Sequence, residues 1–281
     1  MDTTVVDSQI LALHLHDPDW VVVDCRFTLT DPDAGRRAYV AGHIPGARYA
    51  HLNDDLSSPV GAKTGRHPLP DPQVLAAKLG AWGIGPGKQV VVYDDSFGAM
   101  ASRMWWVLRW LGHDAVALLD GGYPRWQREK RPVTAEAPAL MPARFVPRLR
   151  PELCVGADEV ARRVQDPAWL VIDARAEERF NGEIEPLDKV AGHVPGAVNL
   201  PFEDNLHASG VFARHEELVQ LYRDTLRGVA PEHVIMMCGS GVTACHNLVA
   251  MERAGLKGAR LYPGSWSEWI TDPARPVAHD E

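Results

Sequence analysis

The sequence predicts an α/β fold built from two tandem copies of one domain, each with a mostly parallel β-sheet flanked by helices. Three observations support this prediction. The chain of 281 residues contains an internal repeat that covers most of its length. Short, continuously apolar and β-branched runs are typical of strands that are buried on both faces of a sheet. These runs alternate with segments of helical pattern, which is the order expected of parallel β-α units.

Four segments occur twice in the same order, about 150 residues apart, which is too long a period for a solenoid repeat. The paired segments are 16–26 and 165–175, 39–47 and 189–197, 89–103 and 233–246, and 118–126 and 261–269. We therefore expect an N-terminal domain over residues 1–132 and a C-terminal domain over 152–281. Residues 133–151 are rich in proline, which excludes a continuous helix and predicts an extended linker.

The elements of each copy follow from local pattern. Strands are expected at 20–24 and 89–94 in the first copy, and at 169–173 and 233–238 in the second. Helices are expected over 70–84, 99–111, 215–226 and 243–254. Gly112 and Gly255 then stand where a glycine commonly ends a helix.

Composition narrows the class of function. The formal net charge is −8, whereas a nucleic-acid-binding protein usually presents a basic face. The first residues lack the basic and apolar regions of a secretory signal, and the apolar runs are too short to cross a membrane. Four cysteines are too few for a disulfide scaffold. We therefore expect a cytoplasmic protein that binds neither nucleic acid nor membrane, in which a special cysteine would be catalytic.

The strand-to-helix junction MMCGSGVTACHN of the second copy is the predicted site, because ligands of parallel sheets bind at the carboxyl ends of strands. Cys238 ends the strand. Gly239 and Gly241 allow a tight concave turn, whose inward-pointing N–H groups form an anion nest. A helix N-terminus follows at Thr243 or Ala244 and adds positive potential. This setting favours the thiolate form of Cys238 and predicts a nucleophile that needs no metal.

The corresponding position of the first copy is Asp94, in the loop YDDSFGAM. The first copy therefore keeps the scaffold and lacks the nucleophile. We expect this domain to be catalytically inactive.

The loop CGSGVTA, the paired segments AGHIPGA and AGHVPGA, and the terminal PGSWSEW together resemble the tandem-domain rhodanese family over essentially the whole chain. That family comprises thiosulfate sulfurtransferases and 3-mercaptopyruvate sulfurtransferases. The resemblance implies that Cys238 is the nucleophile. The uncharged loop resembles the mercaptopyruvate branch, because the thiosulfate branch usually carries Arg and Lys at the positions of Gly239 and Ser240.

The resemblance also implies how a substrate anion is bound. The segment RFNG assigns this role to Arg179. Mercaptopyruvate enzymes commonly carry a second arginine after an EP pair, but Leu187 stands there in this chain, and Lys189 is the nearest cation that would replace it in part. This departure bears on the choice of donor and leaves the sulfur-transfer assignment intact.

The implied reaction has two steps. The Cys238 thiolate attacks the outer sulfur of the donor and forms a persulfide, which the loop N–H groups between Gly239 and Ala244, including those of Gly241 and Val242, would stabilise. The hydroxyl groups of Ser240 and Thr243 would bind the substrate or the persulfide. A thiol, cyanide or reduced thioredoxin then removes the outer sulfur. Neither a metal nor a cofactor is expected.

Matched residues outside the loop are expected to be structural. His193 lies in a GHxPGA segment that recurs in the inactive copy, and Asp173 ends a strand as Asp24 does in the first copy. His43 is different, because the resemblance associates a histidine of the first copy with the loop serine and an aspartate. Asp31 and Asp33 are both candidates for that aspartate.

Several alternative functions are open. Thiosulfate is the second candidate donor. A phosphatase of the same fold needs Cys-x5-Arg, but the loop contains no arginine, so phosphate would lack its counter-charge. A non-catalytic binding module and a redox sensor that pairs Cys238 with Cys245 are the remaining alternatives.

Overall fold

The computed structural model describes residues 1–279 of the chain, which divide into two compact units. Of the described residues, unit 1 contains 1–58, 69–150 and 208–212, and unit 2 contains 59–68, 151–207 and 213–279. Each unit therefore corresponds to one copy of the repeat, except for the two short segments 59–68 and 208–212. The segment 59–68 comes from the first copy and packs with unit 2.

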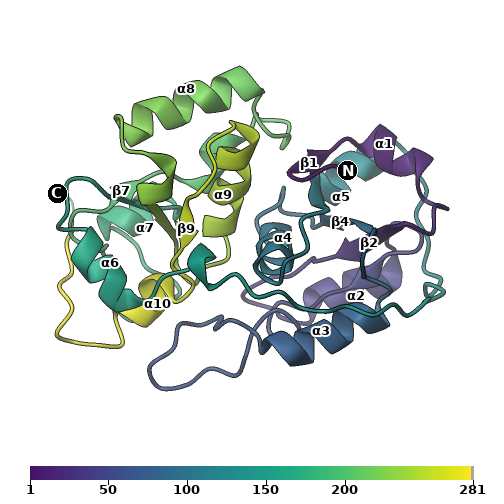
Figure 1. Ribbon diagram of the computed structural model, residues 1–281, viewed down its shortest axis with the longest axis horizontal. Helices are drawn as coiled ribbons and strands as arrows, with labels where there is room; N and C mark the ends of the chain where they lie inside the picture. The colour runs from purple at the N-terminus through teal and green to yellow at the C-terminus, as the bar shows by residue number, and fades with distance from the viewer. Residues whose placement is uncertain (280–281) are drawn as a thin grey trace. The chain divides into compact units, whose positions relative to one another are not determined.

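Unit 1 contains a five-stranded parallel sheet in the order β1-β5-β4-β2-β3. Its strands are β1 (Val5–Val6), β2 (Trp20–Asp24), β3 (Arg48–Tyr49), β4 (Gln89–Tyr93) and β5 (Val116–Leu119). Its helices are α1 (Ser8–Leu13), α2 (Ala34–Ala41), α3 (Pro72–Ala81), α4 (Ala101–Trp110) and α5 (Gly122–Arg128). Figure 1 shows that the strands lie among these helices. The predicted α/β architecture is confirmed for the first copy.

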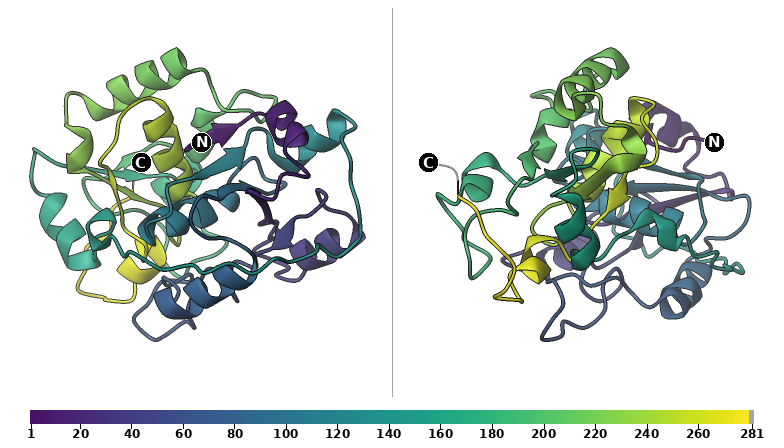
Figure 2. Two further views of the ribbon diagram at one scale, coloured as in Figure 1. Left: turned by 45° about the vertical axis from the view of Figure 1, so that its right-hand side comes forward. Right: turned by 60° about the vertical axis from the view of Figure 1, so that its left-hand side comes forward.

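Unit 2 contains a four-stranded parallel sheet in the order β7-β6-β8-β9. Its strands are β6 (Leu170–Asp173), β7 (Val198–Asn199), β8 (Val234–Met237) and β9 (Arg260–Leu261). Its α-helices are α6 (Ala157–Arg163), α7 (Glu177–Asn181), α8 (His215–Leu226), α9 (Ala244–Arg253) and α10 (Ser265–Trp269), with 3₁₀ turns at Pro151–Leu153, Phe202–Asn205 and Pro231–His233. The helix α8 packs beside α9, and α10 packs beside α6 (Figures 1 and 2).

The sheet of unit 2 is buried on both faces, which explains its continuously apolar strands. Side chains alternate between the faces of a strand. Val171 and Ile235 point to one face, where they pack with Trp266 and Trp269 of α10 and with residues of α6. Ile172 follows Val171 and therefore points to the opposite face of the sheet, where it is also fully buried. Every residue of the strand core must therefore be apolar, as the sequence pattern indicated.

Helix ends follow the expected chemistry. Gly112 and Gly255 both adopt left-handed φ values, of 86° and 79°, just after α4 and α9. Asp71 caps α3 by accepting the backbone N–H groups of Gln73 and Val74. The predicted helix over 215–226 has the bounds of α8. The observed helices α3, α4 and α9 are shorter than the predicted helices by five, three and two residues, counted over both ends of each helix.

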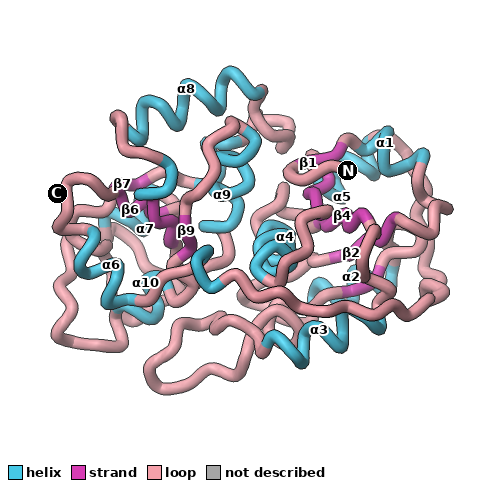
Figure 3. Tube along the Cα trace, viewed as in Figure 1, coloured by secondary structure: helices cyan, strands magenta, loops and turns pink. Residues whose placement is uncertain are grey.

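Residues 133–150, most of the expected linker, contain no helix or strand (Figure 3). The segment belongs to unit 1. Its backbone N–H groups at Ala143, Arg148 and Arg150 donate to the carbonyls of Gly80, Leu111 and Trp110. The segment is thus extended, and specific hydrogen bonds hold it along the α3 and α4 helices of its own unit.

Equivalent ion pairs lie at the carboxyl ends of β2 and β6. Arg26 donates to the buried Asp24 at 2.6 Å and to the Gly42 carbonyl at 2.7 Å. In unit 2, Arg175 donates to Asp173 and to the carbonyl of Gly192, both at 2.8 Å. The prediction of a structural role for the strand-terminal aspartates is confirmed. No helix within residues 1–279 is long and apolar enough to span a membrane.

Candidate active site

Cys238 lies in unit 2 at the carboxyl end of β8, and α9 begins six residues later. The cysteine is 2% exposed. Gly241 has a φ of 73°, and a Cβ atom there would lie 2.3 Å from the carbonyl oxygen of Pro263. Only glycine fits both the left-handed backbone and this close approach. The Gly-rich turn predicted from the sequence therefore folds around the nucleophile position.

Residues of the terminal PGSWSEW motif form hydrogen bonds with the backbone of this loop. The backbone N–H of Cys238 donates to Ser265 Oγ at 3.1 Å. In return, the N–H groups of Trp266 and Ser267 donate to the carbonyls of Cys238 and Gly239 at 3.0 and 2.9 Å. Ser265 itself has a left-handed φ of 53°. These reciprocal bonds fix the backbone on both sides of the sulfur.

The corresponding loop of the first copy carries Asp94 at the position of the cysteine. The Asp94 carboxylate accepts four backbone N–H groups, from Ser96, Gly98, Met100 and Ala101, at 2.7 to 2.9 Å. Asp94 is completely buried. In unit 1 the nest is therefore filled by the side chain that replaces cysteine. By analogy with the repeat, we expect the equivalent N–H groups of unit 2 to lie around the sulfur of Cys238.

A histidine that the sequence analysis did not identify lies beside the loop. Nδ1 of His67 and Oγ of Ser240 are hydrogen-bonded at 2.7 Å, and both residues are buried, with 4% and 5% exposure. His67 belongs to segment 59–68. Because this segment carries no repeat motif, the sequence analysis did not identify it.

His43 has a different environment from the one that the resemblance implied. Its Nδ1 is 2.8 Å from the Tyr39 carbonyl and its Nε2 is 3.1 Å from the Glu136 carbonyl. Its ring stacks on Tyr39 within unit 1. The matched His193 likewise contacts a carbonyl, that of Phe180, at 2.9 Å. Both histidines therefore tie loops, and the serine contact belongs to His67.

The guanidinium of Arg179, on α7, lies beside the loop. An idealised Cβ on Gly239 would lie 3.4 Å from its Nη2 and 3.5 Å from its Nη1. Arg179 also donates to Glu185 at 2.8 Å and to Asp188 at 3.2 Å. Burial raises the pKa of Glu185, but the Arg179 hydrogen bond and two backbone N–H groups outweigh burial and hold that pKa below its ordinary value. The carboxylates thus orient the guanidinium.

A second guanidinium, that of Arg66, lies at the same place. Its Nη2 would be 2.9 Å from a Cβ on Gly239, and its Nη1 donates to Asp188. Leu187 contributes only its backbone N–H to Glu185, and Lys189 is exposed. The cation that accompanies Arg179 is therefore Arg66, which is distant in the sequence.

The remaining predicted loop residues form the start of α9. Val242 and Ala244 are buried, whereas Thr243 is half-buried at the N-cap position and makes no side-chain capping bond. Cys245 is completely buried, and its thiol donates to the Gly241 carbonyl. The four cysteines are free thiols.

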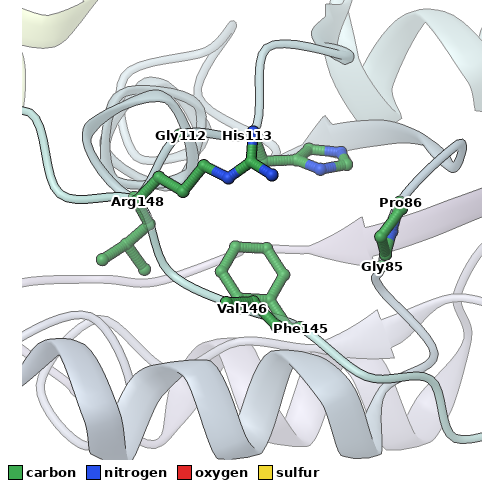
Figure 4. A pocket seen from close by; sticks show the side chains of 8 residues that line it. Gly85, Pro86, Gly112, His113, Phe145, Val146 and Arg148 are labelled. Atoms are coloured by element: carbon green, nitrogen blue, oxygen red, sulfur yellow. The ribbon is translucent and has the colours of Figure 1, made fainter.

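Two surface pockets lie elsewhere. One is in unit 1 and is lined by Gly85, Pro86, Leu111, Gly112, His113, Phe145, Val146 and Arg148. Figure 4 shows the His113 and Arg148 side chains on one side of it and the Phe145 ring on the other. The other pocket lies in unit 2 between α8 and the turn at residues 228–231. Neither pocket is lined by a residue of the Cys238 loop.

Comparison with known proteins agrees with the duplicated architecture. The model of the rhodanese-like domain matches residues 7–129 and again residues 156–272. The chain belongs to the rhodanese-like family.

Two relatives of this rhodanese-like chain carry different donor names. A Pseudomonas aeruginosa protein named "Probable 3-mercaptopyruvate sulfurtransferase" is 50% identical over 98% of this chain and 97% of its own. A Mycobacterium tuberculosis protein with a thiosulfate sulfurtransferase name is 41% identical over 91% of this chain and 89% of its own.

The fold matches that of a solved family member. The crystal structure of the Escherichia coli 3-mercaptopyruvate enzyme SseA superposes with a TM-score of 0.81 and 32% identity, covering 95% of this chain and all of that one. The prediction of two tandem rhodanese-like domains is thereby confirmed.

Proposed function

We propose that this rhodanese-like chain is a sulfurtransferase that moves a sulfane sulfur from 3-mercaptopyruvate to a thiol or to cyanide through a persulfide on Cys238. The main support is the complete Cys238 loop beside the Arg179 guanidinium, in a chain half-identical to a relative with this enzyme name. Thiols, including that of reduced thioredoxin, are the proposed acceptors. The free thiols suit a reducing compartment, so we propose the cytoplasm.

In the first step, the Cys238 thiolate attacks the donor sulfur and an S–S bond forms. The carbon–sulfur bond breaks, and its electron pair goes to pyruvate enolate, which then takes up a proton. Arg179 holds the donor carboxylate by charge-assisted hydrogen bonds. The N–H groups from Gly239 to Ala244 stabilise the negative charge of the persulfide.

The contact between Ser240 and His67 supports a role for the serine hydroxyl at the donor carbonyl. A hydroxyl that is hydrogen-bonded to a buried imidazole can donate to the oxygen on which the enolate charge develops. In the second step, the acceptor thiolate or cyanide attacks the outer sulfur. The S–S bond breaks, and its electron pair returns to Cys238 as thiolate.

Thiosulfate is the second candidate donor. Two guanidinium groups at Gly239 favour it, because they would offset the charge of a dianion where the loop itself carries no lysine or arginine. A non-catalytic binding module would leave the buried Cys238 loop and its orienting contacts without a purpose.

Mass spectrometry of the protein after incubation with 3-mercaptopyruvate, without acceptor, tests the proposal. The peptide that contains Cys238 should gain one sulfur atom, and cyanide should remove it. Cys238→Ser should gain none, whereas Cys154→Ser, at a less buried cysteine outside the loop, should react like the wild type. Absence of the added sulfur from the wild type would overturn the proposal.

A further inference from the structure

The surface pocket of unit 1 lies at the opposite edge of its sheet from Asp94. Pro86 comes just before β4 and His113 comes just before β5, so both lining residues stand at the amino ends of parallel strands. Asp94 follows the carboxyl end of β4. The pocket has a volume of about 300 Å³, at the small end of the range for ligand pockets. It is therefore the size of a site for a small molecule.

The linker forms one wall of this pocket and is held closely against the rest of unit 1. The backbone N–H of Arg148 donates to the carbonyl of Leu111 at 2.8 Å. A Cβ on Gly112 would lie 2.8 Å from the Cβ of Arg148. Before the wall, a Cβ on Gly85 would lie 3.0 Å from the Cβ of Ala143. Glycine at both positions lets the linker approach this closely, so the fold itself fixes the pocket wall.

The pocket has an aromatic side. The rings of Phe145 and His113 are tilted by 44°, with their centroids 6.0 Å apart. Of the apolar lining residues, Leu111 is buried, whereas Val146 is 55% exposed. Figure 4 shows the Phe145 ring on one side of the pocket and the His113 and Arg148 side chains on the other. A flat apolar group between the two sides would contact the Phe145 ring.

The opposite side of the pocket carries one charge. Arg148 is exposed, and its guanidinium forms no ion pair with any residue from 1 to 279. By contrast, Arg150 of the same linker donates to both oxygens of Asp114, at 2.6 and 2.7 Å. Burial lowers the pKa of His113 below its ordinary value, against the opposing effect of two nearby backbone groups. Of the described residues that line the pocket, Arg148 alone is then charged at neutral pH.

We propose that this pocket binds a small aromatic monocarboxylate, whose ring lies against Phe145 and whose carboxylate is held by Arg148. A guanidinium binds a carboxylate through two parallel charge-assisted hydrogen bonds. Contact between two aromatic rings adds stabilisation beyond the apolar area that is buried. The proposal is independent of the sulfurtransferase activity, because no residue of the Cys238 loop lines the pocket.

Phenylacetate is the probe, titrated into the full chain while NMR follows the backbone amides of Gly112 and His113. Both amides should shift saturably, with a Kd of about 1 mM for so small a ligand. Phenylacetamide has the same ring without the charge, so it should bind about tenfold more weakly. Cyclohexylacetate keeps the carboxylate without the aromatic ring, and it should also bind more weakly than phenylacetate.

Variants of the linker assign the contacts. Arg148→Ala should weaken phenylacetate binding by about tenfold or more, and Arg148→Lys should fall between it and the wild type, because lysine keeps the charge and loses the planar fork. Arg144→Ala is the matched control and should bind like the wild type, because Arg144 is an exposed arginine of the same linker that does not line the pocket. Phe145→Leu should weaken the binding of phenylacetate more than that of cyclohexylacetate.

The Cys238 loop also offers an arginine to a carboxylate, so Arg179→Ala separates the two places. Binding that is lost in Arg179→Ala and kept in Arg148→Ala would place the ligand at the loop and overturn the proposal. The absence of a saturable shift at the pocket amides up to about 10 mM, or equal binding by the two alanine variants of the linker, would also overturn it. Weaker binding in Arg148→Ala alone, with equal urea unfolding midpoints for these two linker variants, supports it.

Discussion

Replacing Gly241 with alanine should disable the loop, for reasons that the structure makes quantitative. Its φ of 73° lies in the left-handed region, which costs an L-residue about 1–2 kcal/mol. The added Cβ would lie 2.3 Å from the Pro263 carbonyl oxygen and 2.9 Å from the Pro263 Cα. Because these are backbone atoms, the loop itself must move, at a further cost of about 1–3 kcal/mol. The free energy of unfolding should fall by about 2–5 kcal/mol.

Gly255→Ala is the matched control in the same unit. Gly255 has a φ of 79°, but its added Cβ would meet no atom within 4 Å. In Gly255→Ala, the free energy of unfolding should therefore fall by only about 1–2 kcal/mol, because the left-handed φ is unfavourable for alanine but the added Cβ meets no other atom. The difference between the two variants measures the close approach of the loop to Pro263.

Activity should separate the variants further. Displacing one preorganised N–H donor costs about 10²- to 10³-fold in kcat, so Gly241→Ala should lose at least about 100-fold. Gly255→Ala should keep wild-type kcat/KM, because Gly255 follows the far end of α9. Urea denaturation and steady-state kinetics measure the two effects. Equal unfolding midpoints and equal activities for the two variants would refute this account of the loop.

Three further predictions concern the charged groups. Arg179→Ala should raise KM for an anionic donor by about 10- to 100-fold, and an unchanged KM would remove Arg179 from the site. Asp173→Asn should lower the free energy of unfolding by about 3–5 kcal/mol, because it leaves the buried Arg175 without the carboxylate that it contacts at 2.8 Å. Urea denaturation measures this change. A decrease below about 1 kcal/mol, which is what an exposed ion pair contributes, would contradict the prediction. Because the pKa of Glu185 is held below its ordinary value, ionised Glu185 stabilises the fold above that ordinary value, and this stabilisation is lost as the pH falls through the lowered pKa. Glu185→Gln should therefore flatten the acid side of the stability profile; an identical pH dependence of unfolding in both proteins would show that the carboxylate contributes nothing.

The sequence was sufficient to predict the elements that repeat. The apolar strands at 20–24 and 89–94 became β2 and β4, and their counterparts became β6 and β8, because a strand buried on both faces leaves a continuous apolar run. The Cys238 turn was equally predictable. The tight turn at this strand-to-helix junction needs glycine for its backbone conformation. Such a requirement depends only on the residues of the turn, so the two glycines in the sequence indicate it.

Arg66 and His67 were not predictable in the same way. They lie in a segment with no regular structure and contact residues 122 and 173 positions away. Such long-range contacts depend on tertiary packing, which leaves no periodic pattern. The close approach of Gly65 to Gly264 is the physical reason for the Gly-Arg-His order, but the sequence alone does not indicate the partner.

The sequence predicted only part of the arrangement around Asp94. The repeat showed that the first copy lacks a cysteine. It did not show that the carboxylate accepts four backbone N–H groups and so takes the place of an anion. In the first copy, the backbone N–H groups of the loop are therefore bonded to a side chain of the protein itself.

The most direct test of the central proposal is kcat/KM for 3-mercaptopyruvate and for thiosulfate, measured side by side in the wild type and in Cys238→Ser. We predict a clear preference for 3-mercaptopyruvate in the wild type, because the loop itself carries no lysine or arginine that would favour the dianionic thiosulfate, and Arg179 is proposed to bind the single carboxylate of 3-mercaptopyruvate. We predict no turnover of either donor by Cys238→Ser. Turnover near the wild-type rate in that variant, or a preference for thiosulfate in the wild type, would contradict this account.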